Sequence, residues 1–168
     1  MLERAVGIAP TNGLAVHALA EALIRAGRSD EGTQRLEEAE RLQTREIDDE
    51  RRGRTAAALR LQAEVRMGER DYSGAVDLWR QAISVQGGSA VSHLRLAEAL
   101  AAAQRPNDAV AEYLTAISLG AGADAHRRLA ELYEVLGRPA ESARERVTHV
   151  ERRLEELQQR AEEGAPER

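Results

Sequence analysis

The chain has 168 residues and a formal net charge of −5, and only 2% of its residues are aromatic. This acidic balance argues against nucleic acid as a partner, because DNA and RNA binding requires a basic face and often aromatic platforms. The chain has no cysteine, which excludes disulfide and thiolate chemistry, and no apolar run long enough for membrane insertion.

Residues 1–20 lack the basic start and apolar core of a signal peptide. The compartment therefore stays open, with the cytoplasm as the default. Every basic residue is arginine, and the accompanying abundance of alanine favours a G+C-rich, bacterial coding sequence.

The leading segment, residues 1–10, is predicted to be the end of a repeat. Its apolar residues match those of a later helical segment, residues 79–85. They are Leu2, Ala5, Val6 and Ile8. Such a half repeat cannot bury its apolar face alone, so we expect either missing upstream repeats or cover supplied by another molecule.

A short motif then recurs along the chain. Leu-Ala-Glu-Ala-Leu occurs at 19–23 and 96–100, and Leu-Ala-Glu-Leu-Tyr at 129–133. The motif alanines, counting the Gln-Ala-Glu version, are 43, 34 and 33 residues apart: Ala20, Ala63, Ala97 and Ala130. The pattern predicts helical hairpins that bury these alanines, in units of about 12–52, 53–87, 88–121 and 122–152. Hairpin turns are expected near 27–29, 69–71, 104–106 and 137–139.

A period near 34 residues with two helices per unit resembles the tetratricopeptide-repeat family. Large and small residues stand where that family packs its helices, notably Leu96, Ala97, Leu100, Ala109, Tyr113 and Ala116. The resemblance covers residues 1–152. It implies an all-α, right-handed solenoid of antiparallel helical hairpins that binds proteins or peptides and has no catalytic residues.

The sequence departs from the family pattern at several packing positions. Gly32 and Ser142 replace a small alanine of the second helix, and His93 and His126 stand where an aromatic residue is common. We expect looser packing there. The interval of 43 residues predicts an elongated second helix in the first unit, through the charged stretch 37–54.

Two patterns suggest chemistry but have simpler explanations. Residues 120–125, Gly-Ala-Gly-Ala-Asp-Ala, match a dinucleotide-binding fingerprint, yet the preceding segment has helical periodicity and the repeat places the glycines at a turn. His93 and His126 occupy equivalent places 33 residues apart and are interpreted as packing residues. The sequence predicts no metal site and no cofactor.

The resemblance places a peptide-binding groove along the first helices. A glutamate directly follows the core alanine in each unit, which predicts a column along the groove. The candidate groove residues are His17, Glu21, Arg60, Glu64, Leu94, Glu98, Arg127 and Glu131. Either the column gives the groove an acidic floor for peptides of mixed or basic charge, or pairs at i, i+4 neutralise it. Such pairs are Glu21–Arg25, Arg60–Glu64 and Arg127–Glu131.

The end of the chain predicts a long helix from Pro139 to Glu163. Apolar residues spaced 4, 3, 4, 3, 4 form a heptad stripe along it: Ala143, Val147, Val150, Leu154, Leu157 and Ala161. Residues 153–168 are read as a charged helix extension and tail. The helix is either a solvating cap or an association surface.

Three functions remain open at this point. The first is a non-enzymatic scaffold that binds a protein or peptide in the groove or at the ends. The second is a self-assembling protein whose head-to-tail contacts grow oligomers or filaments. These contacts would join the two chain ends through Leu2, Val6, Ile8, Leu154, Leu157 and Ala161. The third is an accessory domain of a larger protein.

Overall fold

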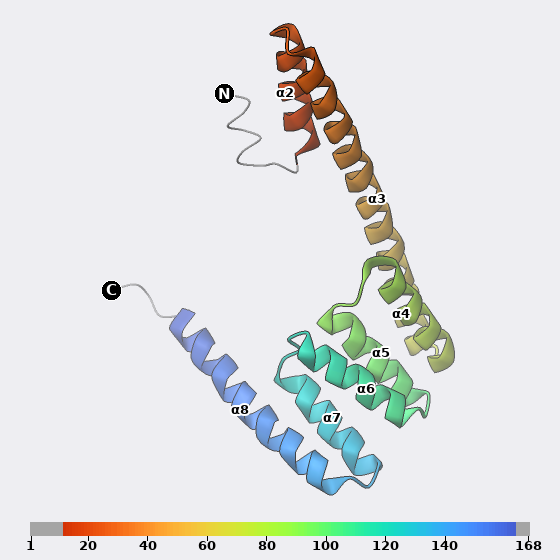
Figure 1. Ribbon diagram of the computed structural model, residues 1–168. Helices are drawn as coiled ribbons and strands as arrows, with labels where there is room; N and C mark the ends of the chain where they lie inside the picture. Colours follow the sequence, from red (N-terminus) through yellow and green to blue (C-terminus); the bar gives the residue numbers. More distant parts are fainter. Residues whose placement is uncertain (1–11, 164–168) are drawn as a thin grey trace. The chain divides into compact units, whose positions relative to one another are not determined.

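The computed structural model describes residues 12–163, which form seven α-helices and no strand (Figure 1). The helices are α2 (Gly13–Arg25), α3 (Ser29–Gly68), α4 (Tyr72–Gln86), α5 (Ala90–Ala102), α6 (Pro106–Ser118), α7 (Ala123–Val135) and α8 (Pro139–Glu163). All four predicted hairpin turns fall between these helices, so the all-α hairpin fold is confirmed. The predicted half repeat at residues 1–10 lies outside the described residues.

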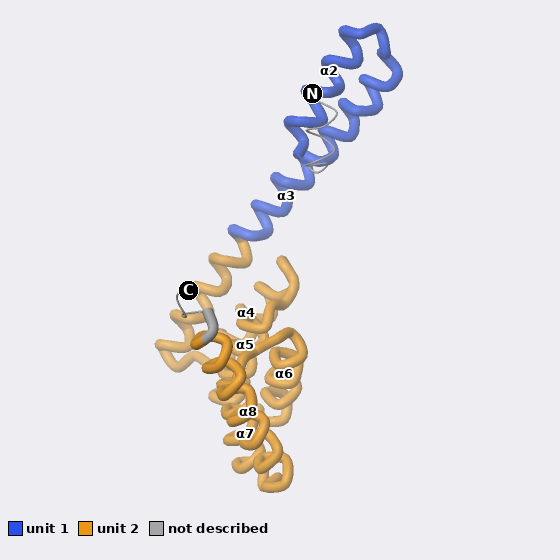
Figure 2. The backbone as a smooth tube through the Cα atoms, turned by 90° about the vertical axis from the view of Figure 1, so that its left-hand side faces the viewer, with its two compact units in different colours: residues 1–54 blue, residues 55–168 orange. Residues whose placement is uncertain are grey.

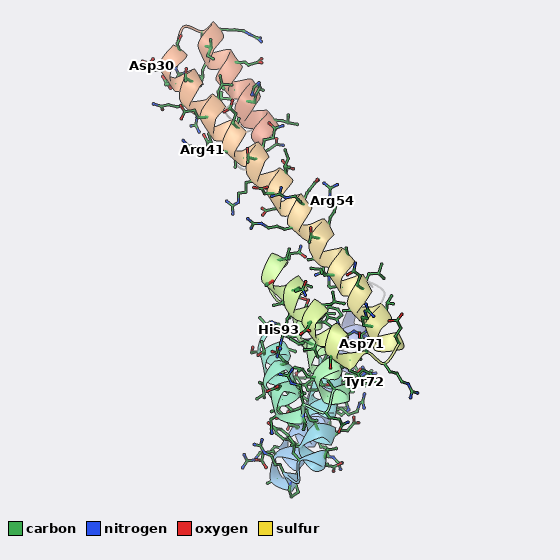
Figure 3. All side chains as sticks on the ribbon, turned by 90° about the vertical axis from the view of Figure 1, so that its right-hand side faces the viewer. Asp30, Arg41, Arg54, Asp71, Tyr72 and His93 are labelled. Carbon is green, nitrogen blue, oxygen red and sulfur yellow. The ribbon has the colours of Figure 1, made fainter. Side chains whose placement is uncertain are left out.

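The chain divides into two compact units, residues 1–54 and 55–168, and the division falls within α3 (Figure 2). The sequence predicts an elongated second helix that ends with the first unit. Instead, α3 continues without a break for 40 residues and also supplies the first helix of the next hairpin. Its middle contains no proline, and charged pairs one turn apart support it, such as Arg54 with Glu50 at 3.0 Å. Charged side chains project from α3 along this stretch, with Asp30, Arg41 and Arg54 labelled in Figure 3.

In the first unit, α2 packs closely on the beginning of α3. Val16, Leu19, Ala20 and Leu23 of α2 are buried. A Cβ atom on Gly32 would lie 2.4 Å from Cγ1 of Ile24 and 3.0 Å from the carbonyl oxygen of Ala20. Glycine therefore permits a tight helix contact here, and the prediction of looser packing at Gly32 was wrong.

The second unit buries the repeated small residues between its helices. Helix α5 packs against α4 and α6, and α7 packs against α6 and α8. The predicted core alanines Ala63, Ala97 and Ala130 are buried, and the largest fully buried side chains nearby are Leu96, Leu100 and Leu129. Small residues at these positions let the helix axes approach closely.

Each hairpin turn uses one residue in the left-handed region. Gly27 and Gly137 have φ values of 81° and 68°, and Arg70 and Gln104 have values of 61° and 60° at the equivalent places. At every turn the amide of the residue after the left-handed one donates to the carbonyl five residues before it, as in Arg105 N to Leu100 O at 2.9 Å. These bonds satisfy carbonyls at the helix end and stop the helix.

Helix α8 is longer than its partner α7, at 25 residues against 13. Glu156 of α8 accepts a hydrogen bond from the Ala123 amide at 3.0 Å, at the beginning of α7. The His149 ring lies 2.8 Å from the Ala123 carbonyl oxygen through Nδ1. Packing between the two helices therefore continues to Glu156, beyond the expected boundary at residue 153. None of the helices between residues 12 and 163 is both long and apolar enough to cross a membrane.

Candidate functional site

A chain of ion pairs crosses the first helices of successive hairpins in the second unit. Arg95 of α5 contacts Glu64 of α3 at 3.5 Å and Glu98, one turn along its own helix, at 2.8 Å. Glu98 also pairs with Arg128 of α7 at 3.3 Å. The Glu98 side chain is only 13% exposed, whereas Glu64, Arg95 and Arg128 are nearly half exposed. We call these four residues the ion-pair ladder.

A cleft of about 260 Å³ adjoins the α7 end of the ladder. Its polar lining comes from Glu98, Tyr113, Arg128 and Glu131, and its apolar lining comes from Ala101, Leu132 and Val135. Val135, at the end of α7, is 79% exposed. The cleft is below the usual size of a small-molecule site, so it suits one side chain of a longer ligand.

The electrostatic environment of this cleft favours a charged Arg95 and a neutral Tyr113. The hydrogen bond and charge of Glu98 raise the pKa of Arg95. Burial, together with the Glu98 carboxylate, raises the pKa of Tyr113 to about 12, while Arg128 opposes this rise. Tyr113 therefore stays protonated at neutral pH.

The structure brings only part of the predicted groove set together. Glu98 and Glu131 line one cleft, and Glu64 joins them through Arg95. Arg60 does not form the expected pair with Glu64, because its guanidinium donates to Gln86 of α4 at 3.2 Å. The prediction of an Arg60–Glu64 pair was therefore wrong. The Glu64 carboxylate pairs with Arg95 of the next repeat instead.

Leu94 and Arg127 lie away from this cleft. Leu94 packs partly into the core and lines a second cleft, of about 360 Å³, together with Val91 and Arg153. Arg127 pairs with Glu131 at 2.6 Å, as predicted, and with Asp124 at 3.7 Å.

His17 and Glu21 belong to the first unit. Glu21 accepts from Arg25 at 2.9 Å, which is the expected pair, and its carboxylate lies 3.5 Å from the His17 ring. His17 also lines a cleft of about 510 Å³ with Leu14 and Ile47, between α2 and α3.

The second unit therefore does not present an acidic floor. Each predicted glutamate there has an arginine partner, and the partners of Glu64 and Glu98 include residues from neighbouring repeats. The face is charge-balanced. The alternative interpretation, a face neutralised by ion pairs, describes this surface better. Some of these pairs join neighbouring repeats, which the i, i+4 spacing did not predict.

Only half of the predicted self-association residues lie in the described part of the chain. Leu2, Val6 and Ile8 lie outside the described residues. Leu154, Leu157 and Ala161 are exposed along α8.

The two equivalent histidines form separate pairs. The His93 ring lies 2.7 Å from a Glu112 carboxylate oxygen, and the His126 ring lies 2.7 Å from one of Glu145. Each pair joins the two helices of one hairpin, in accord with the interpretation as packing residues. Over residues 12–163, His, Asp and Glu side chains form no group of three that could hold a metal ion. The glycine pattern at 120–125 lies at the turn between α6 and α7, where Gly120 has a φ of 89°.

Sequence reasoning missed Tyr113 and Val135 as lining residues. Tyr113 was assigned to packing alone, but it also lines the cleft. The period of 33 residues aligns Arg95 with Arg128 and Glu98 with Glu131, but it gives no signal for Tyr113 or Val135. Two charged residues repeating together on the first helices predict a continuous polar surface.

No family model matches the sequence, and a search of curated proteins finds no relative. Solved structures match instead. The crystal structure of MamA shares 16% identity at a TM-score of 0.60, covering 94% of this chain and 87% of that chain. MamA from Desulfovibrio magneticus RS-1, from its residue 41 to the end, shares 12% at 0.58, covering 92% and 82%.

YrrB, described as a tetratricopeptide-repeat protein with an unusual peptide-binding site, shares 14% identity at a TM-score of 0.54, covering 90% of this chain and 74% of that chain. The predicted resemblance to the tetratricopeptide-repeat fold is confirmed.

Proposed function

We propose that the chain is a non-enzymatic scaffold and that the inner surface of α5 and α7 holds a segment of a partner protein. The observation that carries this proposal is the cleft at the end of the ion-pair ladder. There the partly exposed charges of Arg128 and Glu131 lie beside the apolar side chains of Leu132 and Val135.

The chemistry of the cleft suggests the ligand. Val135 is largely exposed and gives an apolar contact at the rim. Arg128 and Glu131 hold one charge of each sign near it, so a peptide with an apolar anchor and flanking charges of mixed sign fits. Because the Arg127–Glu131 pair beside the cleft is half exposed, exchanging it for a pair between Glu131 and a ligand costs little free energy.

A random-peptide library panned against the full chain supplies the probe for a test. We expect selected peptides to bind the Val135→Asp variant at least about tenfold more weakly, because the apolar contact at the rim is lost. Glu131→Gln should weaken binding of basic peptides, and this loss should shrink as salt rises.

The matched control is Leu114→Asp, which places the same charge on an exposed leucine of the second helix α6. Binding to this variant should be unchanged. Equal binding to the Val135→Asp variant, or loss of binding only in the Leu114→Asp variant, would move the interaction to another surface.

A further inference from the structure

Helix α8 carries an apolar stripe that no other part of the described chain covers. Its four large members are about half exposed: Val147 at 58%, Val150 at 56%, Leu154 at 55% and Leu157 at 49%. Ala143 and Ala161, at the two ends of the stripe, are exposed as well. The heptad stripe predicted from the sequence is therefore exposed, on a helix that lies at the end of the hairpin array (Figure 1).

A different side of α8 packs on α7. Ser142 is buried, and His149 and Glu156 both contact Ala123. These three residues are seven apart and lie on one side of the helix. At about 100° per residue, the stripe is centred roughly a third of a turn away from them. Packing on α7 consequently leaves the stripe free.

The preceding repeat indicates what such a stripe contacts. Val110 and Ile117 of α6 stand 33 residues before Ala143 and Val150, at equivalent positions. Val110 is buried and Ile117 packs against the core. In α6 these positions therefore belong to the packed interior, whereas in α8 they have no such neighbour within residues 12–163.

The charges beside the stripe decide which partner and which direction fit. In heptad terms, Val147, Leu154 and Ala161 are a positions, and Ala143, Val150 and Leu157 are d positions. The g positions are all arginine: Arg146, Arg153 and Arg160. The e positions are Arg144, Glu151 and Gln158.

We propose that this stripe pairs with the same stripe of a second copy, as a short parallel two-stranded coiled coil. In a parallel pair, g residues face e residues five positions later on the other helix, which places Arg146 opposite Glu151 on both sides. In an antiparallel pair, g faces g and e faces e. Three arginine–arginine contacts and a glutamate–glutamate contact would then oppose association.

Both charges are available for this contact. Glu151 is exposed. Arg146 pairs with Glu134 of α7, yet its side chain remains 60% exposed and can pair with a second carboxylate. The pairing differs from a head-to-tail contact, because it joins identical surfaces and does not involve residues 1–11.

The association should be weak. Two stripes of four large aliphatic side chains bury less than the about 1,200 Å² that stable interfaces require. Packing on α7 already holds α8 in place, so little conformational entropy of this helix is lost on dimerisation. A monomer–dimer equilibrium between micromolar and near-millimolar protein is the expected behaviour.

Because the chain has no cysteine, single cysteine variants report the direction of pairing. Ala143→Cys and Ala161→Cys should each form a disulfide-linked homodimer under mild oxidation, since equivalent positions meet in a parallel pair. Gln159→Cys, on the opposite side of α8, is the control and should cross-link at least about tenfold more slowly. Cross-linking only between the two different alanine variants, or equal cross-linking of the control, would overturn the proposal.

A charge exchange tests the flanking pair on the full chain. The Arg146→Glu and Glu151→Arg variants should each dimerise more weakly than the parent chain, because like charges then meet. An equimolar mixture should form heterodimers with near-parental affinity, because both contacts again join opposite charges. Sedimentation that shows a concentration-independent monomer of the parent chain, or no preference for the mixture, would contradict the proposal.

Discussion

Single residues decide how tightly neighbouring helices approach. Gly32 allows α2 and α3 to touch, since an added Cβ would meet backbone and side-chain atoms of α2. Ser142 stands at the corresponding place of α8 and is 2% exposed. Its hydroxyl has no hydrogen-bond partner within the described chain. The two departures from alanine thus have opposite physical consequences, close contact at the glycine and an unpaired polar group at the serine.

Replacing Ser142 by alanine should stabilise the protein. The change removes a buried hydroxyl that makes no hydrogen bond and substitutes a better helix former, for a gain of about 1 kcal/mol in the free energy of unfolding. Urea denaturation of the variant and the parent chain measures the difference. Ser118→Ala, at an exposed helix end, is a suitable control and should change stability much less. A destabilised Ser142→Ala variant would mean that the hydroxyl has a partner in solution.

Helix ends were predicted well, because their causes are local. Pro106 and Pro139 begin helices, and Gly27 and Gly137 end them, so each signal lies within a few residues of its effect. The continuity of α3 could not be predicted in this way. Unit lengths suggested a boundary near residue 52, and Gly53 lies at that place, but no proline or turn interrupts the helix there.

The candidate site was only partly predictable for a related reason. Repeat spacing aligned Glu64, Glu98 and Glu131 on successive first helices, and this placement holds in the second unit. Partner choice depends on side-chain reach between helices. Arg95 and Glu64 pair between two helices, whereas the i, i+4 rule describes only pairs within one helix.

The hairpin turns offer a test at the level of elements. Gln104 adopts a positive φ that glycine occupies at the equivalent Gly27 and Gly137. Gln104→Gly should therefore stabilise the α5–α6 hairpin by up to about 1 kcal/mol, because the left-handed conformation no longer strains a side chain. Thermal and urea unfolding measure the gain. Gln81→Gly, within the interior of α4, is the control and should destabilise by about the same amount.

At the scale of the whole molecule, the two compact units predict uneven stability. Repeat arrays are stabilised by contacts between neighbours, so different parts can open separately. The first unit has a small core, built mainly from four buried residues of α2. In the second unit, α5, α6 and α7 each pack against helices on both sides.

Hydrogen exchange in increasing urea can detect this difference. Amides of α2 should lose protection at lower urea concentrations than those of α5, because fewer buried contacts hold them. The α5–α7 segment should open together and last. Simultaneous loss of protection in both units at every urea concentration would show that the chain unfolds as one cooperative body.

The proposed interaction surface is tested most directly by an NMR titration of the full chain with a peptide selected from the random library. The largest amide and side-chain shift changes are expected around the cleft of α5 and α7, at Glu98, Arg128, Glu131 and Val135. Shift changes confined to the first unit, or to the exposed side of α6, would contradict the proposed interaction surface.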